Sequence, residues 1–317
     1  MGSLGRVLIA APVHLVLTDG LTGYGYTCVE YAGISQDIAF GIIKDCVGIV
    51  TSTRLQLDKE LIDAAPLLKW IGRMGSGMEV IDIEYATLKG INCFASPEGN
   101  CNAVGEHALG MLLALIRRIA WSNAEMKKGI WLRDENRGTE LEGKTIGIIG
   151  YGHTGRAFAK KLMGFDMQIL VYDKYNQQNI PLYVENCESL ERIYDEADIV
   201  SFHVPIQADT INYFNEDFVN QMRKPFILIN TSRGVVVEIQ ALYQGVKEGK
   251  VRGACLDVFE QEPIMKMEHD MWKMMDEMNA MPNILTTPHI AGYTFEALYK
   301  MSKILFEKIA GIPLNNG

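Results

Sequence analysis

The loop GYGHTG at residues 150–155 has the glycine spacing of a loop that holds a diphosphate. An apolar run at 145–149 leads into it, a helix-like apolar pattern follows it, and a second apolar run ends in Asp173. G-x-G-x-x-G is a weak signal alone. Between a predicted strand and a predicted helix, with an acid ending the next strand, it indicates a dinucleotide site. The N–H groups of His153 and Thr154 then face the phosphates at the helix start.

Each glycine of this loop has its own task at such a site. Gly150 allows the tight turn, Gly152 lets the pyrophosphate approach the backbone, and Gly155 permits close contact between helix and strand. Asp173 is placed to accept hydrogen bonds from the hydroxyls of the adenosine ribose. Because a carboxylate there repels the additional phosphate of NADP, the sequence favours NAD, and the neighbouring Lys174 weakens this preference without reversing it.

Two histidines compete for the role of a proton donor and acceptor. His203 and His289 each follow an apolar run and lie near a proline. An imidazole exchanges its proton near neutral pH, and the residue types alone favour neither histidine. Arg233 ends another apolar run, FILINTS, and its planar, permanently charged guanidinium suits a carboxylate.

The elements that must position these residues form two alternating series. Short β-rich runs alternate with helical patterns over residues 6–100 and again from residue 144. Such alternation predicts two α/β domains, each with a parallel sheet and crossover helices. The predicted strands are RVLIA, YTCVEYA, VGIVT, LKWIGRM and INCFAS, then KTIGIIG, MQILVYD, DIVSFHV, FILINTS, VRGACLDV and NILTT.

Three other segments have distinct patterns. Residues 108–116 are apolar nearly all the way round, which predicts a helix buried between domains or between subunits. Residues 264–281 hold seven of the 16 methionines, which favours an adaptable helix packed beside Trp272 over a deformable partner surface. Residues 138–145, GTELEGKT, match a P-loop pattern, but they follow a helix and lead into a strand, so the match is accidental.

Composition and charge narrow the function classes. The 317 residues allow two domains, and 48% hydrophobic with 22% charged residues is typical of a folded globular protein. A net charge of −9 argues against nucleic acid as a partner, and the absence of a long apolar stretch and of a signal-peptide pattern argues against a membrane. Six scattered cysteines without a C-x-x-C pair predict reduced thiols in the cytoplasm and no metal site.

Seven separate stretches resemble one family, the D-isomer-specific 2-hydroxyacid dehydrogenases. None would be decisive alone, but together, in the family's order over residues 70–292, they are specific. The stretches are RMGSGMEVIDIEYA (73–86), GNCNAVGEHALGMLLAL (99–115), ELEGKTIGIIGYGHTGRAFA (140–159), HVP (203–205), INTSRGVVV (229–237), GACLDVFEQEP (253–263) and TPHIAG (287–292).

The resemblance implies an α/β fold of two doubly wound parallel-sheet domains. A Rossmann NAD-binding domain at 101–291 is inserted into a flavodoxin-like substrate domain made of residues 1–100 and a returning C-terminal helix at 292–317. It also implies an NAD-dependent oxidoreductase that transfers hydride between the nicotinamide and a small D-2-hydroxy or 2-oxo acid. Family members are usually homodimers, and the apolar segment 108–116 with Trp131 beyond it fits such a role.

The resemblance also assigns three catalytic residues. Arg233 matches the arginine that binds the substrate carboxylate and carbonyl, His289 matches the acid/base, and Glu262 matches its carboxylate partner, which raises the pKa of the imidazole. Ser76 and Gly77 offer N–H groups to the substrate carboxylate. The expected cofactor contacts are Ser76, Val104, Gly150, Gly152, His153, Thr154, Gly155, Asp173, His203, Val204, Pro205, Thr231, Asp257, His289 and Gly292, with Asp257 on the carboxamide and Val104 on the ring.

The segment 73–84 is most similar to the phosphoglycerate dehydrogenase branch, yet two positions depart from it. Those enzymes commonly carry Arg-Ser where this chain has Thr-Ser at 51–52, and Asp-Asn where it has Glu-Val at 79–80. A phosphate needs cations beyond the one on the carboxylate. We therefore predict an unphosphorylated 2-oxo acid as the preferred substrate, with Arg54, or a neighbouring subunit's Arg133, as the alternative source of a cation.

Two other functions share this fold. An NAD-sensing corepressor needs a partner-binding surface and often carries disordered tails, which this sequence does not suggest. A formate dehydrogenase typically has glutamine at the position of Glu262.

Overall fold

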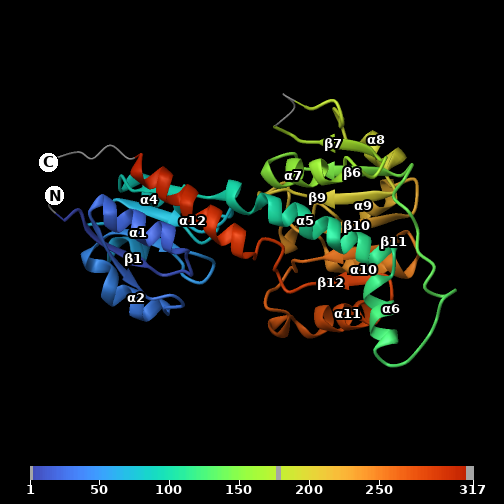
Figure 1. The fold of residues 1–317 in the computed structure, drawn as a ribbon, viewed down its shortest axis with the longest axis horizontal. Helices are drawn as coiled ribbons and strands as arrows, with labels where there is room; N and C mark the ends of the chain where they lie inside the picture. The colour runs from blue at the N-terminus through green and yellow to red at the C-terminus, as the bar shows by residue number, and fades with distance from the viewer. Residues whose placement is uncertain (1–2, 176–179, 312–317) are drawn as a thin grey trace. The chain divides into compact units, whose positions relative to one another are not determined.

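The structure is a computed structural model that describes residues 3–175 and 180–311. The chain divides into two compact units (Figure 1). The first unit combines Met1–Cys101 with Tyr293–Gly317, and the second is Asn102–Gly292. The chain therefore leaves the first unit once and returns to it at its C-terminus. Within the described residues, no helix is both long and apolar enough to cross a lipid bilayer.

A five-stranded parallel sheet forms the centre of the first unit. Its strand order β2-β1-β3-β4-β5 is the flavodoxin-like order of doubly wound sheets. The strands are β1 (Gly5–Ile9), β2 (Tyr26–Glu30), β3 (Cys46–Thr51), β4 (Trp70–Arg73) and β5 (Asn92–Ala95). The helices are α1 (Leu15–Tyr24), α2 (Gln36–Ile42), α3 (Lys59–Asp63), α4 (Ile83–Leu88) and α12 (Phe295–Ala310), with the 3-10 turn η1 (Ile43–Asp45).

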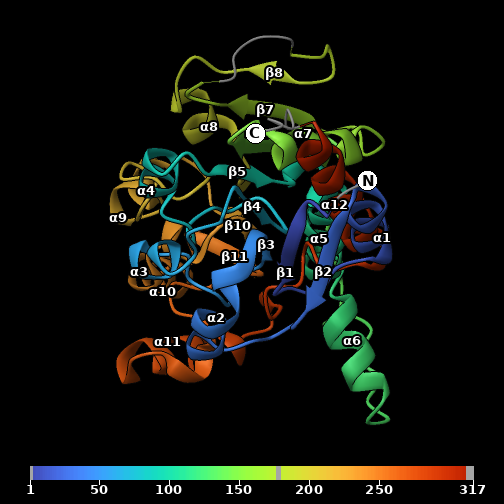
Figure 2. The ribbon, with the colours of Figure 1, turned by 90° about the vertical axis from the view of Figure 1, so that its left-hand side faces the viewer.

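Helices cover both faces of this sheet, with α1 and α12 on one side and α2, α3 and α4 on the other (Figure 2). The C-terminal helix α12 buries Leu305 and Ile309 in the core of its face. It is also tied by hydrogen bonds, because the Ser302 hydroxyl accepts from the backbone N–H of His14 at 2.9 Å. The last helix is thus part of the first unit's core.

A seven-stranded parallel sheet forms the centre of the second unit. Its order is β12-β11-β10-β9-β6-β7-β8, which is the Rossmann order with one strand added at the β12 edge. The strands are β6 (Thr145–Ile149), β7 (Gln168–Tyr172), β8 (Glu185–Asn186), β9 (Ile199–Phe202), β10 (Phe226–Asn230), β11 (Val251–Leu256) and β12 (Ile284–Thr286). Eleven of the twelve strands coincide with the predicted runs, and the two-residue β8 was not predicted.

The second unit has two layers of helices and two cores. Helices α5 and α7 pack on one face, and α8 to α11 pack on the other. Strands β6 and β9 are buried at every residue, which explains why they read as continuous apolar runs. The helices are α5 (Pro97–Ile116), α6 (Ile119–Met126), α7 (His153–Leu162), α8 (Glu191–Glu196), α9 (Glu216–Gln221), α10 (Ile239–Lys247) and α11 (His269–Asn279), with η2 (Gly234–Val236) and η3 (Ile264–Lys266).

The methionine-rich segment contributes to the core. Met267, Met275 and Met278 are buried, and most of the other methionines there pack against the same cluster. Met265 alone among them is largely exposed, with 86% of its surface accessible. The packing interpretation of this segment therefore fits the structure better than a deformable surface.

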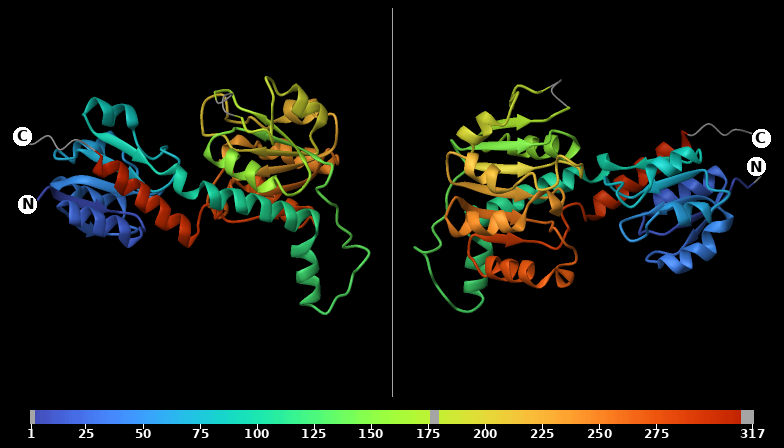
Figure 3. Two further views of the ribbon diagram at one scale, coloured as in Figure 1. Left: turned by 45° about the horizontal axis from the view of Figure 1, so that its top comes forward. Right: turned by 180° about the vertical axis from the view of Figure 1, so that it is seen from behind.

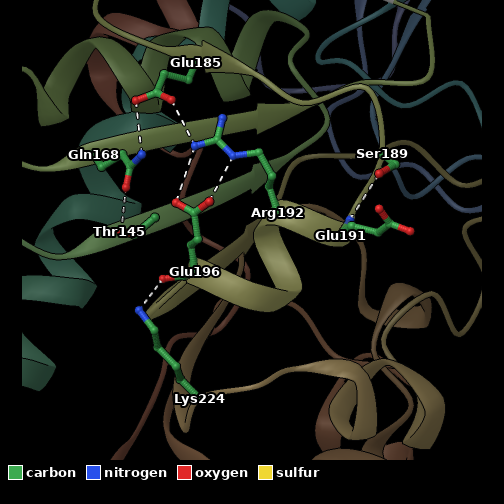
Figure 4. A network of polar contacts seen from close by, with 8 residues as sticks. All are labelled: Thr145, Gln168, Glu185, Ser189, Glu191, Arg192, Glu196 and Lys224. Atoms are coloured by element: carbon green, nitrogen blue, oxygen red, sulfur yellow. Dashed lines mark hydrogen bonds and ion pairs between the residues drawn. The ribbon is translucent and has the colours of Figure 1, made fainter.

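A polar network joins the amino ends of β6, β7 and β8 to α8 (Figure 4). Arg192 on α8 binds Glu185 of β8 at 3.0 Å and Glu196, one turn further along its own helix, at 3.0 Å. Gln168 at the start of β7 donates to Glu185 and accepts from the Thr145 hydroxyl of β6. The short strand β8 is thus held at the sheet edge by polar side chains. Its sequence, Glu-Asn, contains no apolar residue that could have indicated a strand.

Helix α6 and the chain that follows it project from the end of α5, away from the sheet of the second unit (Figure 3). No residue of α6 is buried. The segment exposes large apolar side chains, including Ile119, Met126 and Trp131, the last with 75% of its surface accessible.

Candidate active site

Arg233 lies just beyond the carboxyl end of β10, at the edge where parallel α/β sheets bind their ligands. Gly234, the next residue, explains how the loop that carries Arg233 is packed. A Cβ added to Gly234 would lie 1.7 Å from the backbone oxygen of Phe259, so only glycine allows the two loops to meet. This contact brings the loop of Arg233 beside the loop that leads to Glu262.

Glu262 and His289 form the closest acid–base pair of the site. Nδ1 of His289 lies 2.6 Å from Oε2 of Glu262, and the backbone N–H of Phe259 donates to Oε1 of Glu262 at 2.9 Å. The side chains are 32% exposed for Glu262 and 48% exposed for His289. With Nδ1 held by the carboxylate, Nε2 is the ring nitrogen left to exchange a proton with a substrate.

The two members of the pair shift each other's pKa in opposite directions. The hydrogen bond that His289 donates to Glu262 raises the pKa of His289. Partial burial and the charge of Arg233 oppose this rise. Burial raises the pKa of Glu262, but the hydrogen bonds from His289 and Phe259 and the charge of Arg233 outweigh it, so this pKa is lowered. The pair therefore favours the charged imidazolium more than the surroundings of an isolated histidine would.

Asp257 fixes the loop that carries His289. Its carboxylate is fully buried and accepts from the Thr287 hydroxyl at 2.6 Å and from the N–H groups of Ile290 and Ala291 at 2.9 and 2.8 Å. Between these contacts the backbone N–H of His289 donates to the Asp257 carbonyl, and His289 has a φ of 53°. A non-glycine residue adopts this left-handed conformation only when its surroundings enforce it.

The competing histidine, His203, has a different environment. It is buried, its Nε2 lies 2.8 Å from the Ser201 hydroxyl, and Nδ1 has no hydrogen-bond partner among the described residues. Burial without a neighbouring carboxylate lowers the pKa of His203 to about 3. Such an imidazole stays neutral at physiological pH, so the geometry favours His289 as the proton donor.

The glycine loop has the strand-turn-helix context that its sequence predicted. It links β6 to α7, which begins at His153 with Gly152 as its N-cap. A Cβ added to Gly155 would lie 2.1 Å from the backbone oxygen of Gly150, so the first turn of the helix sits directly on the turn. Asp173, at the end of β7, accepts from the backbone N–H of Tyr151 at 2.6 Å.

Comparison with known proteins decides the family. The family model described as "D-isomer specific 2-hydroxyacid dehydrogenase, NAD binding domain" matches residues 109–291. The chain belongs to this family. It is 38% identical to a glyoxylate reductase of Thermofilum pendens over 263 residues, which cover 81% of this chain and 75% of that protein. It is 33% identical to a D-3-phosphoglycerate dehydrogenase of Archaeoglobus fulgidus over 316 residues, covering 98% of this chain but only 58% of that longer protein.

A solved relative agrees in fold. The D-lactate dehydrogenase of Aquifex aeolicus, a structure complexed with NAD and lactic acid, superposes with a TM-score of 0.81 and 28% identity over 96% of this chain and 94% of that one. This protein is accordingly an NAD-dependent oxidoreductase of the D-2-hydroxyacid dehydrogenase family, with the two predicted parallel-sheet α/β domains.

In this dehydrogenase, a cavity of about 460 Å³, here called the cofactor cavity, lies in the second unit and is lined in part by the glycine loop. It brings together six of the predicted cofactor residues: Gly150, Gly152, Asp173, His203, Val204 and Pro205. Thr231, at the end of β10, is buried with a hydroxyl that has no hydrogen-bond partner among the described residues, and its contact with the cofactor remains a prediction.

Other predicted residues lie elsewhere. Ser76 and Gly77 follow β4 in the first unit, Ser76 exposed and Gly77 buried, and their assignment remains a prediction. Val104 is buried in α5, and Gly292 is the last residue of the second unit. The contact of Asp257 with the carboxamide also remains a prediction.

Sequence reasoning missed two groups that the structure brings to the site. His107 on α5 lies 3.0 Å from the Thr287 hydroxyl and 3.6 Å from Asp257, and thus joins the support of the His289 loop. Asp209 lines the cofactor cavity and pairs with Lys174. His107 lies within the stretch 99–115, where nothing marked it as a site residue, and Asp209 lies in none of the seven stretches, although its position soon after HVP is a signal that this loop reaches the cavity.

Proposed function

We propose that the protein reduces a small 2-oxo acid to the D-2-hydroxy acid with NADH. The observation that carries this proposal is the 2.6 Å pair of His289 and Glu262 beside Arg233. Bound NADH supplies the hydride. Arg233 binds the substrate carboxylate and carbonyl, because its fork matches two oxygens and its charge attracts the developing alkoxide.

The protonation chemistry belongs to His289. As imidazolium it gives the Nε2 proton to the carbonyl oxygen during reduction, and as imidazole it accepts that proton during oxidation. Glu262 holds the ring by Nδ1 and stabilises its charged form, while Asp257 holds the backbone on which the ring is carried. In this assignment residues 101–291 bind NAD, and residues 1–100 with 292–317 bind the substrate, Ser76 and Gly77 holding its carboxylate.

The preferred substrate in this proposal is unphosphorylated, such as hydroxypyruvate or glyoxylate. Thr51 takes the place of the arginine expected for a phosphate, and it is completely buried. Arg73 at the Gly-Ser-Gly turn is also buried, and it donates to the carbonyl of Met74. Its guanidinium is therefore held at the turn by the fold, whereas a second anionic group on the substrate needs a cation of its own.

The test is a comparison of kcat/KM for NADH-dependent reduction of hydroxypyruvate, glyoxylate and phosphohydroxypyruvate. We expect an unphosphorylated acid to have the highest value. A preference for phosphohydroxypyruvate by more than about tenfold, or 1.4 kcal/mol, would refute the substrate assignment while leaving the reaction class intact.

We further propose that the protein is a homodimer joined through the second unit. The arm formed by α6 and residues 127–132 exposes Ile119, Met126 and Trp131, which is typical of a surface covered by a partner. A second copy is the occupant we propose, because arms projecting from two identical units can each cover the other. Light scattering after gel filtration should give the dimer mass, and Trp131→Glu should shift it toward the monomer.

A further inference from the structure

The strongest unassigned feature of the described chain is an ion pair at the rim of the cofactor cavity. Nζ of Lys174 lies 2.6 Å from Oδ2 of Asp209, and both residues line the cavity with Asp173. We propose that Asp209 is a second determinant of cofactor choice, which excludes NADP by holding Lys174 away from a 2′-phosphate. This inference rests on the proposed use of NADH and on the prediction from the sequence that Asp173 binds the adenosine ribose.

Two segments distant in sequence form the pair. Lys174 follows Asp173 at the end of β7, and Asp209 lies in the loop after β9. That loop has a defined shape, since the Thr210 hydroxyl donates to the Pro205 carbonyl at 2.7 Å and accepts from the backbone N–H of Gln207 at 2.8 Å. Asp209 is therefore presented to the cavity by a hydrogen-bonded turn.

The charges of the cavity explain why the pair matters. Lys174 carries the one positive charge among the described residues that line the cavity, because His203 is held neutral by burial. Asp173 already has its carboxylate fixed by the N–H groups of Tyr151 and Tyr175. A phosphate monoester, with about −1.5 to −2 charges at neutral pH, would thus meet two carboxylates and one ammonium that is already paired.

The pairing also sets the protonation of its members. The hydrogen bond with Asp209 raises the pKa of Lys174, and the hydrogen bond with Lys174 lowers the pKa of Asp209. Both groups are therefore charged at neutral pH, and the ion pair is intact there. Their side chains are 58% and 48% exposed, which limits the effect to a modest factor.

Binding of adenosine 2′,5′-bisphosphate and of 5′-AMP, measured by calorimetry, tests the inference without catalysis. Asp209→Asn should improve the affinity for the bisphosphate relative to 5′-AMP by about fivefold, the upper range for an exposed pair. Adding Lys174→Ala to this variant should remove the gain, since the freed lysine is its cause. The same ranking should appear in kcat/KM for NADPH relative to NADH.

Asp195→Asn is the matched control. Asp195 is similarly exposed, belongs to the same unit and is paired with Arg223, but it is not among the residues that line the cofactor cavity. Asp195→Asn should leave the ratio of the affinities for the bisphosphate and for 5′-AMP unchanged. Two results would overturn the inference, provided that 5′-AMP binds all variants. One is an unchanged affinity ratio in Asp209→Asn, and the other is an improved affinity for the bisphosphate that persists when Lys174 is also replaced. If 5′-AMP does not bind the unmodified protein, the cofactor assignment falls and this inference with it.

Discussion

Replacing Glu262 with glutamine should remove the charge that favours the imidazolium while keeping the size of the side chain. Unit charges about 4 Å apart attract by roughly 4 kcal/mol at an effective dielectric constant of about 20. Nδ1 and Oε2 are 2.6 Å apart, but the two side chains are 48% and 32% exposed. Solvent screening reduces the net effect to about 1 kcal/mol, or roughly fivefold less imidazolium at a pH above the pKa of His289.

The sign of the pH effect follows from the direction of the pKa shift. Glu262 raises the pKa of His289, so Glu262→Gln should lower it. Reduction needs the imidazolium and declines as pH rises through this pKa, whereas oxidation needs the neutral ring and increases. In the variant, the falling limb of the reduction profile and the rising limb of the oxidation profile should therefore both move to lower pH. The kcat/KM for reduction should fall about fivefold on the alkaline side and change little at acid pH.

The assay is kcat/KM against pH for NADH-dependent reduction and for the reverse oxidation. Glu260→Gln removes the same charge from the same loop and serves as the control. Its pH profiles should have their limbs at the same pH as those of the unmodified enzyme. An equal loss at every pH in Glu262→Gln would mean that Glu262 acts only on structure. Unmoved limbs would mean that His289 is not the titrating group, and either result would refute the reasoning.

Five further substitutions test the cofactor turn and the choice of histidine. Asp173→Ala should narrow the preference for NADH over NADPH in kcat/KM, because it removes a ribose partner and a repulsive charge; an unchanged ratio argues against its role. His203→Ala should slow single-turnover hydride transfer by less than about tenfold, whereas His289→Ala should slow it by about 10² to 10⁴-fold; the opposite ranking would mean that the acid is misassigned. Gly155→Ala should lower the Tm, because its Cβ would lie 2.1 Å from a backbone oxygen, while Gly152→Ala, whose Cβ meets nothing within 4 Å, should keep the Tm and lose NADH affinity.

The central strands of both sheets could be predicted because their residues are buried on both faces. The five residues of β6 and the four of β9 are all buried, and such strands appear as unbroken apolar runs. Strand β8 has only two residues, Glu185 and Asn186, and is held by Arg192 and Gln168. A strand that is stabilised by polar side chains at a sheet edge has no apolar run from which it could be predicted.

The site could be predicted only where a motif marked it. The glycine loop and Asp173 follow from local order, whereas the residue types around His203 and His289 favour neither histidine, and only the resemblance to the family selected His289. What separates them is burial and the carboxylate of Glu262, 27 positions from His289, and both depend on tertiary structure. The pair of Lys174 and Asp209, 35 positions apart, was invisible for the same reason.

The central claim is that His289 protonates the substrate during hydride transfer from NADH. Single-turnover oxidation of bound NADH by hydroxypyruvate, measured in the unmodified protein and in His289→Ala, tests it most directly when the NADH affinity of both is determined by fluorescence titration. We expect the variant to bind NADH as the unmodified protein does and to transfer hydride about 10² to 10⁴-fold more slowly. Transfer at nearly the original rate, with NADH affinity intact, would contradict the account.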